Sequence, residues 1–124
     1  MGYRSQVMIG IEVIPECSKL IDACKDAEPD SFTTIEGDGC SDILRFEWTH
    51  VKWYDSFEDV ARIMIEVHGI DEIAPNPKYP RYPFGMFIIG EDWSDIEYHG
   101  DPWSVGIQLN RYLTWEAPLI VEGI

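Results

Sequence analysis

The sequence predicts a single α+β domain over residues 1–124, with two helices packed on one face of a largely antiparallel sheet. Two stretches repeat their apolar residues at helical spacing, whereas other apolar stretches alternate with polar residues as strands do. In chain order these are a strand, a helix, one or two strands, a second helix and several further strands. This order favours helices on one side of an antiparallel sheet, and 124 residues with 45% hydrophobic content are enough for one core.

The chain begins with a strand and a helix. The stretch QVMIGIEVI, residues 6–14, alternates as a strand does. The residues of its apolar face are Val7, Ile9, Ile11 and Val13. Pro15 then opens a helix over residues 15–27, since proline is tolerated in a first turn. The residues of its apolar stripe are Cys17, Leu20, Ile21 and Cys24. We therefore expect both cysteines to be buried core residues rather than reactive thiols.

Two further strands are expected in the middle of the chain. The first is a short strand over residues 32–35, between loops rich in Gly, Asp and Ser. The second lies in ILRFEWTHVKWY, residues 43–54, where the apolar residues change from one face to the other. We expect a bulge or bend near Thr49 and His50 to reconcile the two faces, with His50 partly buried in the sheet.

The second helix has the clearest pattern. It starts near Ser56, which has the capping-box spacing to Asp59, and is expected to end at Gly69. The residues of its buried stripe are Val60, Ile63, Met64 and Val67. The stretch PNPKYPRYP, residues 75–83, has four prolines and is therefore expected to be an exposed loop.

The last third of the chain is expected to be strands. Residues 84–90 and 95–100 form two strands joined through EDWS, residues 91–94. A further strand is expected within PWSVGIQLNRYLTW, residues 102–115. The residues expected on one face of that strand are Trp103, Val105, Ile107 and Leu109.

The charge balance indicates what kind of partner the protein binds. The chain contains nine Lys and Arg residues and 23 Asp and Glu residues, which gives a net charge of −14 and a pI of about 4.3. Direct binding to nucleic acid or to an anionic membrane is disfavoured, because both need clustered cations. A positively charged protein partner is favoured instead. An acidic surface that only maintains solubility is the other explanation of this composition.

Several functional classes lack their sequence signals. The chain has no GxSxG, HExxH, Walker or GxGxxG motif, so we expect no enzymatic activity, no catalytic residue and no cofactor. Its three cysteines form no CxxC pair, which favours a reducing cytoplasm over a disulfide framework or a structural zinc site. No apolar run is long enough to span a bilayer, and no secretory signal is recognisable.

The most acidic stretch is FIIGEDWSDIEYHGD, residues 87–101, which holds five carboxylates and no Lys or Arg. Strand alternation places Asp95, Glu97, His99 and Asp101 on one face, away from Tyr98. The first hypothesis is a partner-binding surface that presents carboxylates to a basic protein, with tryptophans as apolar anchors. The residues expected on it are Glu91, Asp92, Trp93, Asp95, Glu97, Asp101 and Trp103, together with Glu58, Asp59 and Glu66 of the second helix.

Two alternatives remain open at this point. The carboxylates of residues 92–101 and His99 can instead serve a small ligand or a divalent metal ion, although the spacing does not match an EF-hand. The protein can also be a virion or assembly component that self-associates through its tryptophan-rich sheet. A monomer and a small homo-oligomer are both compatible with the sequence.

Three stretches together resemble a known group of proteins: MGYRSQV, VKWYDSFEDV and FIIGEDWSDIEYHGDPW. They are similar to small uncharacterised proteins of tailed bacteriophages and prophages, which begin with a similar GYRS followed by a strand. The resemblance implies a small accessory protein that works in the cytoplasm of an infected bacterium, and it carries over no catalytic residue. Small acidic phage proteins of this kind are often inhibitors of restriction enzymes or CRISPR effectors, in some cases by nucleic-acid mimicry. Such an inhibitor is the function we expect.

Overall fold

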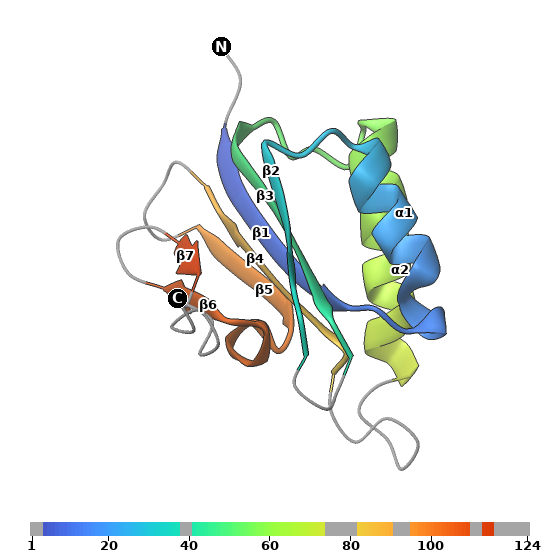
Figure 1. Ribbon diagram of the computed structural model, residues 1–124. Coiled ribbons are helices and arrows are strands. Elements are labelled where there is room, and N and C mark those ends of the chain that lie inside the picture. Colours follow the sequence, from blue (N-terminus) through green and yellow to red (C-terminus); the bar gives the residue numbers. More distant parts are fainter. Residues whose placement is uncertain (1–3, 38–40, 74–81, 91–94, 110–112, 116–124) are drawn as a thin grey trace.

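The fold is built on a five-stranded antiparallel sheet in the order β2-β3-β1-β4-β5 (Figure 1). The computed structural model describes residues 4–37, 41–73, 82–90, 95–109 and 113–115. The five strands are β1 (Ser5–Glu12), β2 (Ser31–Ile35), β3 (Ile43–Val51), β4 (Phe84–Ile89) and β5 (Ile96–Gly100). Helices α1 (Ser18–Asp26) and α2 (Glu58–Ile73) lie side by side on one face, which confirms the predicted α+β class.

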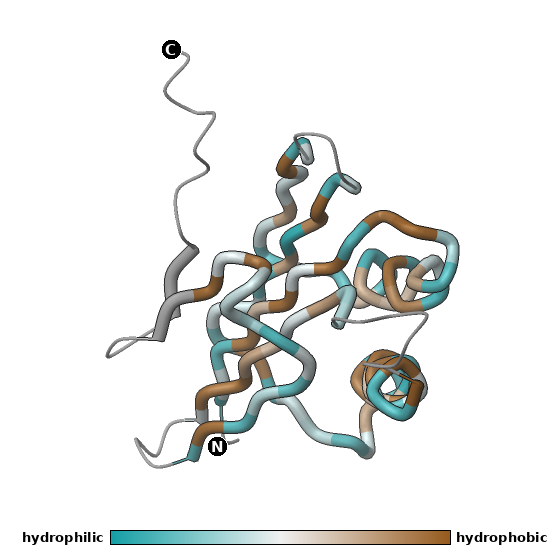
Figure 2. Tube along the Cα trace, turned by 90° about the horizontal axis from the view of Figure 1, so that it is seen from below, coloured by the Kyte–Doolittle hydropathy of each residue, from teal (hydrophilic) through white to brown (hydrophobic). Residues whose placement is uncertain are grey.

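The main hydrophobic core lies between the sheet and the two helices. Alternation along β1 brings Val7, Ile9 and Ile11 into this core, as predicted. Val13 is about half exposed, because β1 ends at Glu12. The predicted stripes of both helices are buried against the same strands, including Cys17, which ends the short 3₁₀ turn η1 (Pro15–Cys17) before α1. Figure 2 shows the helix layer and the sheet from below, with hydrophobic segments along both.

The predicted bulge in β3 is confirmed. Val7 pairs with Trp48, whereas Ser5 pairs with Val51, so three steps along β3 match two steps along β1. At the irregularity the backbone N–H of Thr49 donates to the carboxylate of Asp30 at 2.7 Å. The expectation of a partly buried His50 is wrong, because this residue is exposed at the end of β3.

The expected end of the second helix at Gly69 is also wrong. Helix α2 continues through Gly69 to Ile73. The reason is Ile70, which is only 7% exposed and packs in the main core. Burying an isoleucine stabilises a fold by about 1.5–3 kcal/mol, whereas glycine in a helix costs about 1 kcal/mol relative to alanine. Packing therefore outweighs the local preference of glycine to stop the helix.

A smaller core covers part of the opposite face of the sheet. Met8, Phe87 and Ile89 point to this side and pack against Val105 and Ile107. The stretch of residues 102–115 does contain strand, as expected, but only from Ile107 onward, because its first part is a turn. Its residues form a 3₁₀ turn, η2 (Pro102–Val105), and a separate hairpin of β6 (Ile107–Leu109) and β7 (Leu113–Trp115).

A capping carboxylate and one glycine of the sheet explain why η2 forms where it does. Pro102 occupies the first turn, and the carboxylate of Asp101 accepts a hydrogen bond from the backbone N–H of Ser104 at 3.3 Å. The turn lies directly on Gly85, where an added Cβ would come within 2.3 Å of the carbonyl oxygen of Asp101. The alternating pattern read as a strand thus reflects a tight turn that packs on a glycine of the sheet.

Candidate functional site

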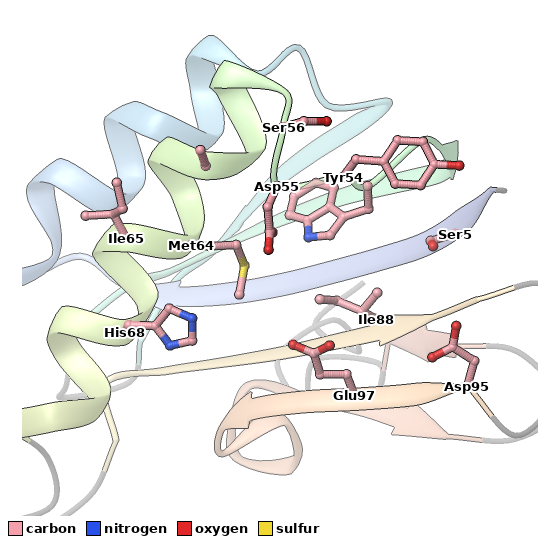
Figure 3. Close-up of a pocket in the computed structure, with 12 residues that line it drawn as sticks. Ser5, Tyr54, Asp55, Ser56, Met64, Ile65, His68, Ile88, Asp95 and Glu97 are labelled. Carbon is pink, nitrogen blue, oxygen red and sulfur yellow. The ribbon is translucent and has the colours of Figure 1, made fainter. Parts of the chain in front are cut away.

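A groove of about 680 Å³ runs between α2 and the edge of the sheet that β4 and β5 form (Figure 3). Its floor includes Ile88 of β4, and Met64 contributes from α2. Carboxylates reach it from opposite sides, Asp55 from the loop before α2 and Glu97 from β5. Among the described residues that line the groove, three are acidic and none is Lys or Arg. The groove is therefore a negatively charged recess.

The strand register explains how β5 supplies its acids. Glu97 pairs with Ile88, whose side chain belongs to the core beneath the helices, so Glu97 lies on the same side of the sheet, toward α2. Asp95 lies where the hairpin closes, and its carbonyl oxygen accepts a hydrogen bond from the N–H of Gly90 at 2.9 Å. Backbone hydrogen bonds thus position both carboxylates, which keeps them on a rigid element.

Aromatic side chains complete the groove. Trp53 lines it, and its indole Nε1 is buried without a hydrogen-bond partner among the described residues. The ring packs against Trp48, with the ring centroids 5.3 Å apart, and Trp48 itself donates to the carbonyl oxygen of Ala27 at 3.1 Å. A buried N–H without an acceptor is costly.

The outer side of α2 continues this acidic surface. Glu58, Asp59 and Glu66 border a shallower hollow of about 370 Å³. Ala61 and Ile65 line both the hollow and the groove, and Ile65 is 67% exposed. An exposed aliphatic side chain thus stands between two groups of carboxylates. We call this region the acidic α2 surface. Its residues are Asp55, Glu58, Asp59, Ile65, Glu66, Asp95 and Glu97.

One cation, Arg62, lies among the acids of α2. Arg62 of α2 bonds to Asp26 of α1 at 2.6 Å, and both side chains are at least half exposed. The hydrogen bond to Asp26 raises the pKa of the Arg62 guanidinium, and the charges of Asp22 and Asp59 act in the same direction. The guanidinium therefore lies among several carboxylates and offsets only part of their charge.

A histidine and carboxylate cluster lies beside the groove. His68 and Asp71 come from successive turns of α2, and His99 comes from β5. The Nδ1 atom of His99 is 3.5 Å from Asp71 Oδ2, and its Nε2 atom is 2.5 Å from Glu97 Oε2. The rings of His68 and His99 meet edge to face, with centroids 5.4 Å apart. Nitrogen and oxygen ligand atoms therefore converge from two elements.

The structure brings together some of the predicted site residues and separates others. Asp95 and Glu97 lie in the groove, and Glu58, Asp59 and Glu66 lie on α2 as expected. Asp101 does not continue the β5 face, because the chain turns at Gly100 and the Asp101 carboxylate caps η2.

The expected tryptophan anchors are not part of this surface. Trp103 packs on the opposite face of the sheet, with its ring centroid 5.3 Å from that of Phe87 and 5.5 Å from that of Tyr98. Trp93 lies outside the described residues, as do Glu91 and Asp92. The apolar group that does lie among the acids is Ile65.

Sequence reasoning missed four residues of the site. Asp55 and Ile65 carry no motif, although an isoleucine outside the buried stripe of a helix is a detectable signal. His68 and Asp71 have a spacing of three residues, which places them on one side of a helix. Their meeting with His99 depends on β5 lying beside α2, and the local pattern does not contain this information.

Comparison with protein-family models, with curated proteins and with solved structures finds no match to this chain. Within the described residues, neither helix is long and apolar enough to cross a bilayer.

Proposed function

We propose that the protein is a small acidic accessory protein that binds and inhibits a basic protein of a bacterial host. The observation that carries this proposal is the acidic α2 surface, where carboxylates from a loop, a helix and a strand flank the exposed Ile65. Acids on both sides of an apolar residue favour a protein partner, since interfaces combine apolar anchors with a polar rim.

The groove is suited to a lysine or arginine side chain of that partner. Asp55, Asp95 and Glu97 provide negative charge, and Trp53 and Tyr54 provide aromatic surface. A cation beside carboxylates and aromatic faces gains both Coulomb and cation–π energy.

The regular backbone that holds the charges supports one class of partner. Helix α2 and strand β5 hold their carboxylates on regular backbone, so the acids form a fixed pattern as phosphates do along a nucleic acid. A cleft that binds nucleic acid accepts such a pattern. The resemblance to phage proteins supports a nucleic-acid-binding or defence protein, such as a restriction enzyme or CRISPR effector, in the cytoplasm of an infected cell.

A capture experiment with two matched variants tests this proposal. The groove variant Asp55→Asn/Asp95→Asn and the control variant Glu28→Gln/Glu36→Gln each remove two exposed negative charges. The proteins are immobilised in EDTA buffer, incubated with bacterial lysate at low and high salt, and the captured proteins are identified by mass spectrometry. We expect wild type and control to capture the same basic nucleic-acid-binding protein, with affinity for the groove variant about tenfold weaker.

The variant Ile65→Ser separates apolar contact from charge. Because Ile65 is exposed, its replacement should leave the melting temperature unchanged but weaken binding of the captured protein about tenfold. The proposal fails if no basic protein is captured at either salt concentration. Equal binding by the groove variant and its control would also overturn it.

A further inference from the structure

We infer that His68, Asp71 and His99 form a binding site for a zinc ion or a similar transition metal, with Glu97 holding His99 in place. This site shares Glu97 with the acidic α2 surface, but its ligands are two imidazoles and Asp71, which the proposed partner binding does not use. Its ligand atoms all lie within 4.8 Å of one another. In a tetrahedral zinc site, neighbouring ligand atoms are roughly 3.4 Å apart, so small side-chain rotations close the cluster around an ion.

The hydrogen bonds of His99 favour a cation in this position. A carboxylate only accepts hydrogen bonds, so the contact of 2.5 Å between His99 Nε2 and Glu97 Oε2 places a proton on Nε2. The other ring nitrogen, Nδ1, faces Asp71 Oδ2 at 3.5 Å. This separation is longer than an ordinary N–H···O hydrogen bond and is close to the spacing of neighbouring ligand atoms in a tetrahedral zinc site. A metal ion can therefore bind both atoms with little movement of either side chain.

The contact with Glu97 has a second consequence for the metal. A histidine that binds a metal usually donates its other N–H to a carboxylate or carbonyl, which fixes the tautomer and makes the ligand more basic. Glu97 and His99 show this arrangement. The side chain of His99 is only 14% exposed, and that of Asp71 is 28% exposed. The two inner ligands are thus held by packing, while His68 remains accessible at the surface.

The donor set determines which metal fits. Two imidazoles and one carboxylate suit zinc, cobalt and nickel, whereas magnesium and calcium prefer oxygen ligands alone. Three protein ligands leave one position of a tetrahedron for water or an external group. His68 and Glu97 also line the groove, so this position is close to the recess described above. The site differs from the one expected among the carboxylates of residues 92–101, because two of its three ligands come from α2.

Titration calorimetry and cobalt absorption spectra test the assignment. The protein is used untagged and with Cys40→Ser, which removes the third cysteine of the sequence as a competing thiolate ligand. It is treated with a chelator, dialysed and titrated with Zn²⁺, Co²⁺ and Mg²⁺. We expect one Zn²⁺ per chain, a rise in melting temperature with Zn²⁺ but not with Mg²⁺, and a visible Co²⁺ spectrum typical of four-coordinate geometry.

Three variants test which residues bind the zinc ion. His68→Ala should weaken Zn²⁺ binding at least about tenfold without unfolding the protein, since His68 is exposed. Glu97→Gln should weaken it about tenfold, because the ring loses its charged partner. His50→Ala removes another exposed histidine from β3 and should leave the affinity unchanged. The assignment is overturned if zinc fails to bind with one-to-one stoichiometry, or if His68→Ala and His50→Ala have the same effect.

Discussion

Cys17 and Cys24 illustrate how burial alone determines the chemistry of a side chain. Both are fully buried beneath the helix layer. Burial raises the pKa of the Cys17 thiol to about 12, and the charges of Glu12 and Glu16 act in the same direction. Burial also raises the pKa of the Cys24 thiol. The sequence predicted this role from helical spacing, since an amphipathic stripe places its small apolar residues against the sheet. Neither thiol is therefore available as a nucleophile.

The raised thiol pKa values predict how stability depends on pH. In the unfolded chain each thiol has an ordinary pKa of 9.0 and loses its proton above that pH, while the folded chain keeps it. The thiols therefore contribute their full stability below pH 9, and this is lost as pH rises from about 9 toward 12. The expected decrease in unfolding free energy is up to about 1.4 kcal/mol per pH unit for each thiol.

Urea denaturation at pH 7.5, 9 and 10 measures this effect. The control is the variant Cys17→Ala/Cys24→Ala, which keeps every lysine and tyrosine that also titrates in this range. Its unfolding free energy should fall less steeply with pH than that of the wild type. Parallel slopes for the two proteins would show that the thiols are not protected from ionisation.

Helix α2 shows where local sequence signals determine an element and where packing overrides them. The apolar spacing predicted the helix and its buried stripe. In β3, the apolar residues change from one face of the strand to the other, and this change predicted the bulge opposite Ser5. The end of the helix was not predictable from Gly69, because burial of Ile70 is a property of the assembled core. Local spacing likewise predicts a strand where η2 forms. The turn depends on its contact with Gly85, which joins distant parts of the chain and is absent from the local pattern.

Gly69→Ala is expected to stabilise the protein. The glycine lies inside α2, and a Cβ added there meets no atom within 4 Å. Alanine restricts the unfolded chain and favours the helix, so the unfolding free energy should rise by about 0.5–1 kcal/mol. Urea denaturation of the variant measures the change.

The same substitution at Gly85, in the sheet, is expected to have the opposite effect on stability. Gly85→Ala would place Cβ within 2.4 Å of Pro102 Cα, and its three nearest contacts are all with backbone atoms that cannot rotate away. It should lower the unfolding free energy by about 1–3 kcal/mol. A neutral or destabilising effect of Gly69→Ala would contradict the helix that we describe through this position.

The layered arrangement of the whole molecule assembles the site from separate parts of the sequence. Chain order and alternation predicted that Asp95 and Glu97 share one face of their strand, but not that this face lies toward the helices. They did not predict that α2 lies beside β5, the strand at one edge of the sheet, which brings His68 and Asp71 to His99. Placing a helix over a particular strand depends on core packing over the full sheet, and no short motif records it.

The net charge of the molecule predicts a stabilising effect of salt. A chain with a net charge of −14 repels itself in the compact state, and most described acids are on the surface. Raising NaCl from 10 to 150 mM shortens the Debye length from about 30 Å to about 8 Å, which screens this repulsion. The melting temperature measured by calorimetry should therefore rise over this range.

The variant Glu28→Gln/Glu36→Gln makes the salt prediction quantitative. Its net charge is −12, two less in magnitude than the −14 of the wild type. Because self-repulsion grows roughly with the square of the net charge, the salt-dependent rise should shrink by roughly a quarter. The variant should also melt at a higher temperature than wild type at 10 mM NaCl, since both residues are exposed and their loss leaves no buried group without a partner.

A melting temperature that falls with salt would mean that attractive pairs, such as Arg62 with Asp26, dominate the electrostatics of the fold. In that case the acidic α2 surface would be locally neutralised, and its attraction for a basic protein would be weak.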